Sequence, residues 1–285
     1  MEPHSPDQSV KLTLDHSCSL KIDDSGLEVR CEDDSKALQS LVFLKSEMFR
    51  SFECPSTRKF SVLFVQLLDT LNVLSFAHGC MDMSYPGPNG ELTFEVQDSH
   101  SGYLMNTYAR ISSVEMPDVH DLEEYWSEPS SYFLTQGSIM KEVVEDLEWP
   151  GGTTVEIVME REPQHLSMIA SGTGRMTVEM PVTDLSGFFC ALPEVRHSYK
   201  YRNLRAAFCH LPSGSQKEFS SISTKVTVDA QGLLKVAHVI SVLSTGNHQG
   251  GNMPYEGGTI NSQGASTHAS RAATIHFYMQ PVIED

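Results

Sequence analysis

The chain has 285 residues, of which 40% are hydrophobic, so it has enough apolar sequence for one large domain or two of ordinary size. Its formal net charge of −17 argues against a protein that coats nucleic acids or membrane surfaces through overall positive charge, but it leaves room for local basic patches. No apolar run approaches the ~20 residues of a transmembrane helix. The six cysteines form no closely spaced pair, and residues 1–10 lack the pattern of a secretory signal. We therefore expect a protein of the cytosol or nucleus, with no membrane contact.

The first half of the chain predicts several strands and one helix. Residues 1–9 are polar and are expected to be disordered. Residues 11–31 alternate apolar and polar side chains, which is the period of a half-buried strand, and the turn at Asp23 to Gly26 divides them into a hairpin. Residues 60–77 carry leucines at helical spacing and predict a helix. Further strands are expected within residues 37–49, 80–85, 91–97 and 102–112.

The second half repeats this order after an acidic segment without periodicity. We place domain 1 at residues 10–115, a linker at 116–130 and domain 2 at 131–285. Domain 2 is expected to hold helices at 137–149 and 201–211, a hairpin at 225–240 and a last strand at 274–282. Residues 244–271 contain six glycines and few apolar residues, which predicts a flexible insertion.

A six-residue pattern in the first hairpin recurs in the second half. It begins at Ile22 with Ile-Asp-x-x-Gly-Leu and returns from Val228 as Val-Asp-x-x-Gly-Leu. Shared hairpin chemistry explains such a match by itself, and a duplicated domain explains it together with the repeated order of elements.

Nothing in the sequence predicts a catalytic site. The acidic clusters fall in turns, in the linker and on a helix surface, whereas a metal-dependent nuclease needs carboxylates that converge on metal ions. The one G-x-G, at residues 172–174, lacks the third glycine and the helix of a dinucleotide site. The histidines show no metal-ligand spacing. We expect no cofactor and no metal, although a site built from distant positions is left open.

One local charge pattern stands out in this acidic chain. Arg196, Lys200, Arg202 and Arg205 follow one another with no acidic residue between them. Arg202 and Arg205 are three apart and would share one helix face. Two interpretations are open: ordinary surface cations, or a face that contacts phosphates.

Several segments together resemble the Rad-one subunit of the nine-one-one DNA-damage checkpoint clamp. The most specific are DLEWPG at 146–151, YKYRNL at 199–204 and HFYMQP at 276–281, and the resemblance runs from about residue 16 to the C-terminus. It implies an α+β fold like that of proliferating-cell nuclear antigen, with two similar sliding-clamp domains, outer antiparallel sheets and inner helices.

The resemblance also implies a function and partners. The chain would be a non-enzymatic nuclear subunit of a heterotrimeric ring with Rad-nine-type and Hus-one-type subunits. A clamp loader would place the ring around double-stranded DNA at damaged or stalled sites, where it would recruit checkpoint and repair factors. The alternative is a 3′–5′ exonuclease of DNA repair, an activity associated with the family for which these residues give no support.

Site residues follow from the same resemblance. The family begins domain 1 with a strand and a helix, and both are expected to be missing before residue 17. The DNA-facing residues would be Lys141, Lys200, Arg202 and Arg205. The edge strands that pair with neighbouring subunits would contain Tyr103, Met105, Thr107 and Ala109 in domain 1, and Arg175, Thr177 and Glu179 in domain 2.

Overall fold

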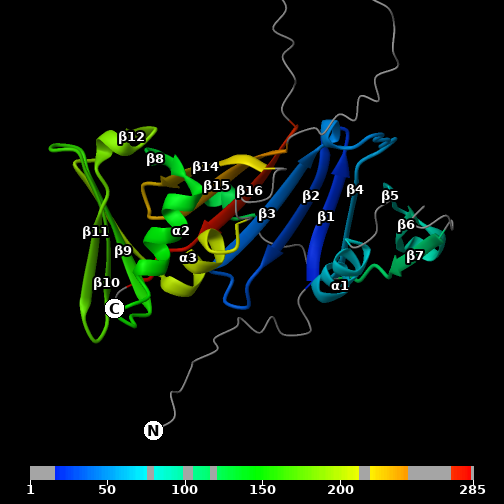
Figure 1. The fold of residues 1–285 in the computed structure, drawn as a ribbon, viewed down its shortest axis with the longest axis horizontal. Coiled ribbons are helices and arrows are strands. Elements are labelled where there is room, and N and C mark those ends of the chain that lie inside the picture. The colour runs from blue at the N-terminus through cyan, green and yellow to red at the C-terminus, as the bar shows by residue number, and fades with distance from the viewer. Residues whose placement is uncertain are drawn as a thin grey trace, which may run out of the picture. The chain divides into compact units, whose positions relative to one another are not determined.

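The computed structural model describes residues 17–75, 80–98, 105–115, 121–211, 219–242 and 271–283 (Figure 1). These residues form two compact units: unit 1 holds the described residues of Met1–Ser46 and Phe52–Trp126, and unit 2 holds those of Glu47–Ser51 and Ser127–Asp285. The predicted disorder of residues 1–9 and the predicted insertion 244–271 lie outside the described residues. Within the described parts, no helix has the length and apolar character needed to cross a membrane.

The first sheet of unit 1 contains four antiparallel strands in the order β3-β2-β1-β4. The predicted hairpin forms its middle, and an Asp23 carboxylate oxygen accepts the backbone N–H of Ser25 at 3.0 Å in the turn. Gly26 has a φ of +151° and lies so close to the carbonyl oxygen of Leu44 that a side chain would collide with it, which explains the glycine. The strands are β1 Ser17–Asp23, β2 Gly26–Glu32, β3 Leu38–Lys45 and β4 Arg58–Leu63.

The helix predicted over residues 60–77 is wrong at its start. Residues Arg58–Leu63 form β4, and helix α1 spans only Phe64–Leu74. Phe60 and Val62 are 8% and 0% exposed and pair with β1, so burial on one face of a sheet outweighs the helical spacing of the leucines. In α1 only Leu67 and Leu74 are buried.

Unit 1 continues with a three-stranded antiparallel sheet in the order β5-β6-β7. Its central strand supplies the buried residues Leu92, Phe94 and Val96, whose alternation matches the predicted strand. β5 is exposed at nearly every position. The strands are β5 Cys80–Ser84, β6 Leu92–Asp98 and β7 Met105–Ile111.

Part of the predicted linker 116–130 packs onto unit 1. Leu122 is buried, and its N–H donates to the side-chain oxygen of Gln39 at 3.3 Å. Asp121 pairs with Arg30 of β2 at 2.6 Å. The acidic residues of this segment suggested a linker, but one of them, Asp121, holds the segment against the sheet through its ion pair with Arg30.

Unit 2 has a second four-stranded sheet in the order β11-β10-β9-β13 and a five-stranded sheet in the order β12-β8-β14-β15-β16. Helices α2 and α3 lie beside each other in this unit (Figure 1). Both helices end before the positions predicted from the sequence, at Asp146 and Phe208. The elements are β8 Ser131–Gln136, α2 Gly137–Asp146, β9 Thr154–Glu160, β10 His165–Ser171, β11 Arg175–Glu179, β12 Gly187–Phe189, β13 Glu194–Lys200, α3 Tyr201–Phe208, β14 Phe219–Val228, β15 Leu234–Val242 and β16 Arg271–Met279.

The two units repeat one arrangement. The strand order β3-β2-β1-β4 of unit 1 matches β11-β10-β9-β13 of unit 2, and a helix follows the last of these strands in both units. The sheet β5-β6-β7 matches β14-β15-β16. Unit 2 also has β8, which pairs with β14, and α2, which packs on α3. In the described part of unit 1, β5 and α1 have no such partners.

The recurring six-residue pattern does not reflect this repeat. Its first copy turns from β1 to β2, whereas its second copy turns from β14 to β15, and these hairpins are not equivalent. In both turns an aspartate accepts the N–H two residues later, from Ser25 to Asp23 and from Gln231 to Asp229. The match is therefore shared turn chemistry.

Candidate nucleic-acid interface and subunit edges

The charged face of unit 2 arises from the packing of α2 on α3. α2 buries Met140, Val143 and Val144, and α3 buries Leu204 and Phe208. Each helix therefore has one apolar side in the core and presents its remaining positions to solvent. The charged residues of both helices occupy these remaining positions.

The two helices run antiparallel. The carboxylate of Glu148, just after α2, lies 3.4 Å from the guanidinium of Arg205 in the last turn of α3. Burial, together with the charge of Glu148, raises the pKa of the Tyr201 hydroxyl at the first position of α3. At the other end, burial and the charge of Glu145 raise the pKa of the Cys209 thiol just after α3. The end of α2 is therefore beside the start of α3.

The four predicted DNA-facing cations lie on or next to these helices. Arg202 and Arg205 are both exposed on α3, and Lys200 is the last residue of β13, directly before that helix. Lys141 on α2 lies 3.9 Å from the Glu145 carboxylate. The Lys141–Glu145 pair and the Arg205–Glu148 pair are both substantially exposed. Such exposed ion pairs are worth only about 0.2–1 kcal/mol, so phosphate oxygens can replace the carboxylates at little cost.

Arg196, the first cation of the acid-free run, lies elsewhere. It is on β13, where its guanidinium pairs with Glu194 at 2.8 Å and with Glu156 of the neighbouring strand β9 at 3.0 Å. These contacts raise the pKa of Arg196, chiefly through Glu194. The segment from Arg196 to Arg205 contains no acidic residue, but the sheet places Glu156 beside Arg196. Sequence spacing alone does not reveal this contact.

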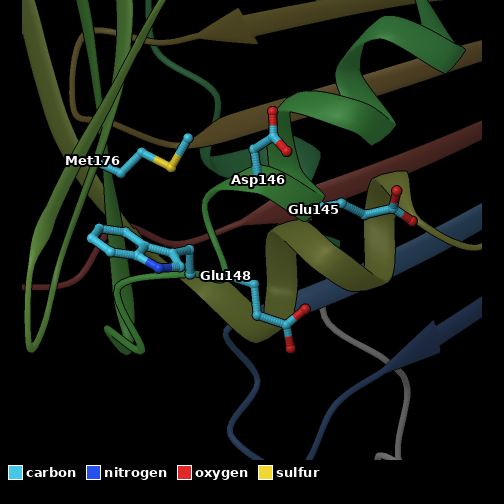
Figure 2. A pocket seen from close by; sticks show the side chains of 5 residues that line it. Glu145, Asp146, Glu148 and Met176 are labelled. Carbon is cyan, nitrogen blue, oxygen red and sulfur yellow. The ribbon is translucent and has the colours of Figure 1, made fainter.

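An open hollow of about 560 Å³ lies beside the helix pair and is lined by Glu145, Asp146, Glu148, Trp149 and Met176. Figure 2 shows the three carboxylates coming from the end of α2 and the segment after it, with Met176 reaching in from β11. Trp149 is 72% exposed, and its ring lies directly over Gly174. The sequence analysis did not single out this hollow, because its residues come from two segments that only the fold brings together.

Three carboxylates, those of Glu145, Asp146 and Glu148, line this hollow, but they do not form a candidate metal site. In the ranges that the structure describes, no group of three or more histidine, cysteine or acidic residues could hold a metal ion. The structure therefore adds no candidate metal ligands to those considered from the sequence.

The predicted edge residues fall on strands with one unpaired side. β7 pairs only with β6, and β11 only with β10, among the strands that the structure describes. Thr107 and Ala109 lie in β7, Met105 is its first residue, and Tyr103 lies outside the described residues. Arg175, Thr177 and Glu179 alternate on the exposed positions of β11. A strand with an unpaired side offers backbone N–H and C=O groups to another strand.

Comparison with solved structures identifies the fold. The chain is similar to a PCNA from Thermococcus kodakaraensis, with a TM-score of 0.64 and 12% identity over 93% of this chain and 90% of that one. It is equally similar to a chain of the PCNA2-PCNA3 complex from Sulfolobus tokodaii, with a TM-score of 0.64 and 14% identity over 94% and 91%. The predicted sliding-clamp fold is thus confirmed.

Comparison with families and curated proteins completes the assignment. No curated protein sequence matches the chain. The family model described as "Repair protein Rad1/Rec1/Rad17" matches residues 9–240, which is most of the chain, and confirms the resemblance found in the sequence. The chain belongs to the Rad1/Rec1/Rad17 family of repair proteins.

Proposed function

We propose that this chain is a non-enzymatic subunit of a heterotrimeric DNA sliding clamp that acts in the nucleus. Its partners are Rad-nine-type and Hus-one-type subunits, and a clamp loader places the ring around double-stranded DNA at damaged or stalled sites. There the ring recruits checkpoint signalling and repair factors. Family membership and the clamp fold support this proposal. The single observation that carries it is a clamp fold of two units, each with an edge strand that is unpaired on one side among the strands described here.

Ring assembly would use these edges. β7 and β11 each offer a row of backbone groups to a strand of a neighbouring subunit, which is how sheets are extended between chains. In an antiparallel strand, successive N–H groups point to opposite sides. Of Thr177 and Val178, which pair with Ile169 and Met168 of β10, one N–H therefore points toward β10 and the other toward the free edge.

This alternation gives a matched pair of variants. Thr177→Pro and Val178→Pro each remove one donor, and the variant that loses the outward donor should weaken co-purification with the subunit that binds β11 while unit 2 still folds. The variant that loses the inward donor should instead lower stability. Equal assembly of both folded variants with the partners would contradict a β11 interface. Co-purification of the parent chain with the two partner subunits is the direct test of the ring itself.

The helix face of unit 2 would face the DNA. Arg202, Arg205, Lys200 and Lys141 supply positive charge in a chain of net charge −17, whereas α1 contains no lysine or arginine. A ring that encircles DNA is retained by topology, so a few exchangeable cations suffice and base contacts are unnecessary. Such contacts bind any sequence and weaken with salt, by a log–log slope of roughly 0.9 per phosphate neutralised.

Charge reversal on this face tests the DNA contact. Arg202→Glu/Arg205→Glu should shorten the retention of the loaded ring on end-blocked DNA at low salt and have less effect at high salt. Arg161→Glu/Lys225→Glu is the control, because it makes the same charge change at exposed positions outside the helix pair. Gel filtration should show normal trimers for both variants. Equal retention of the two variants at every salt concentration would leave these arginines as ordinary surface residues.

The non-enzymatic role has its own test. The purified parent protein is incubated with Mg²⁺ and labelled single-stranded DNA. A triple variant, Glu145→Ala/Asp146→Ala/Glu148→Ala, which lacks the carboxylates of the hollow, is assayed in parallel. We expect no cleavage that depends on these residues. Turnover by the parent chain that disappears in the triple variant would establish an exonuclease instead.

A further inference from the structure

Two cysteines face each other across the first hairpin of unit 1. β1 and β2 pair in antiparallel register as far as Ser19 opposite Arg30, and continuing this register by one residue places Cys18 opposite Cys31 on one face of the sheet. Their side chains are close enough that a hydrogen bond between them shifts the pKa of both thiols. Directly opposed residues of antiparallel strands have Cα atoms about 4.5 or 5.5 Å apart. Both separations fall within the range of about 4.4–6.8 Å that a disulfide needs.

The two thiols differ in their surroundings. Cys18 is fully buried, and its sulfur also lies 3.7 Å from the carbonyl oxygen of Val62 on β4. Cys31 is only partly buried, so we expect a small oxidant to reach the pair from its side. Cys190 is also buried, but its sulfur contacts oxygen atoms, namely the hydroxyl of Ser131 and the carbonyl oxygens of Met159 and Leu192.

The contact also shifts the pKa values of the two thiols. The hydrogen bond with Cys31 lowers the pKa of Cys18. The same contact, together with burial, raises the pKa of Cys31. The thiolate is the reactive form of cysteine, and whichever sulfur of the pair reacts has the other sulfur held against it.

We propose that Cys18 and Cys31 are an oxidation site that closes to a disulfide in the presence of hydrogen peroxide. One sulfur of the pair, as its thiolate, attacks one peroxide oxygen, the O–O bond breaks, and after proton uptake this cysteine is a sulfenic acid and one water is released. The sulfur of the other cysteine then attacks the sulfur of the sulfenic acid, its proton leaves with the hydroxyl group, and a second water is released. Two thiols are oxidised by two electrons in total, peroxide is reduced to water, and a dithiol reductant reverses the change.

The disulfide would join the two middle strands of the sheet β3-β2-β1-β4 and should stabilise unit 1. Cross-linking limits the freedom of the unfolded chain, and two opposed residues need little backbone movement to be bridged. Since Cys18 is buried, closure should be slower than oxidation of the exposed thiol Cys80.

Peptide mapping after peroxide treatment tests the site. The background carries Cys54→Ser/Cys80→Ser to remove the more accessible thiols, and free thiols are alkylated after unfolding. Trypsin should then release residues 12–21 and 31–36 as one linked species, and two thiols per chain should be protected from alkylation. Dithiothreitol should separate the two peptides. Cys18→Ser and Cys31→Ser should each abolish the linked species.

A second measurement does not depend on these variants. In a Trp149→Phe background, Trp126 is the remaining tryptophan and reports on unit 1. Peroxide should raise the unfolding temperature seen by Trp126, and dithiothreitol should lower it again. Oxidation of Cys18 or Cys31 to sulfinic acid without a link would overturn the proposal. So would a link to another cysteine, or two thiols that stay free under prolonged peroxide treatment, long after Cys80 of the parent chain is fully oxidised.

Discussion

Acidification should destabilise unit 2 through one buried histidine. His238 of β15 is fully buried, with one ring nitrogen 3.0 Å from the carbonyl oxygen of Ala207 and the other 2.8 Å from the hydroxyl of Thr224. The carbonyl can only accept, so the neutral ring donates to Ala207 and accepts from Thr224. The rings of Phe208 and Phe277 lie edge-on at 5.7 and 6.0 Å. A charged imidazolium would therefore be placed in an apolar core.

The size of the effect follows from the pKa. The pKa of His238 is lowered to about 4 from its ordinary value of 6.5, chiefly by burial; the Ala207 carbonyl opposes the shift and the charge of His276 adds to it. Above pH 6.5 the ring is neutral in both the folded and the unfolded chain. Between pH 6.5 and 4 the unfolded chain binds a proton that the folded chain does not, so the free energy of unfolding falls as the pH falls. The loss is about 2 kcal/mol at pH 5 and approaches about 3 kcal/mol below pH 4.

Urea unfolding across this pH range measures the loss. Trp126→Phe leaves Trp149 as the tryptophan that reports on unit 2. Carboxylates titrate in the same range, so the informative quantity is the difference between this protein and the same protein with His238→Gln. His238→Gln should be less stable at pH 8, because glutamine fits the site less well, and the difference should shrink by about 2 kcal/mol at pH 5. A difference that stays constant from pH 8 to pH 5 would show that the buried ring does not control this pH dependence.

Local patterns predicted much of the fold. The hairpin β1-β2, the central strand β6 and the helices α2 and α3 were found from alternation, turn residues and helical spacing, all of which act within a few residues. The start of α1 was missed because Phe60 and Val62 fit a helix or a strand equally well. Their pairing with β1, about 40 residues earlier in the chain, decides between the two.

The candidate site was less accessible to sequence reasoning. The ion pair between Lys141 and Glu145 is four residues apart on one helix and could be expected, whereas Arg196 meets Glu156 only because β9 and β13 are neighbours. The opposed cysteines are an intermediate case. A two-residue turn at positions 24 and 25 places Cys18 opposite Cys31 by counting alone, so the hairpin contained a signal that was not used.

Two further predictions concern the stability of unit 2, both measured by urea unfolding with Trp149 as the reporter. Met140→Ala should cost about 2–5 kcal/mol because this fully buried side chain fills the contact of α2 with the core, whereas Glu142→Ala on the exposed side should change stability by less than about 0.5 kcal/mol. The turn from β14 to β15 should depend strongly on Asp229, which is 2% exposed and accepts four hydrogen bonds. Two come from the backbone N–H groups of Gln231 and Leu233, at 2.8 and 2.7 Å. The other two come from the N–H and the hydroxyl of Ser127, both at 2.9 Å. Asparagine keeps one accepting oxygen, but its NH₂ group would face two of these donors, so Asp229→Asn should cost about 2–4 kcal/mol. The matched control is Asp23→Asn, observed through Trp126, because the same sequence pattern there is more exposed and its aspartate holds Ser25 and Lys21 in the turn. Its cost should stay below about 1 kcal/mol. Equal costs at the two turns would mean that burial of the carboxylate does not set its contribution.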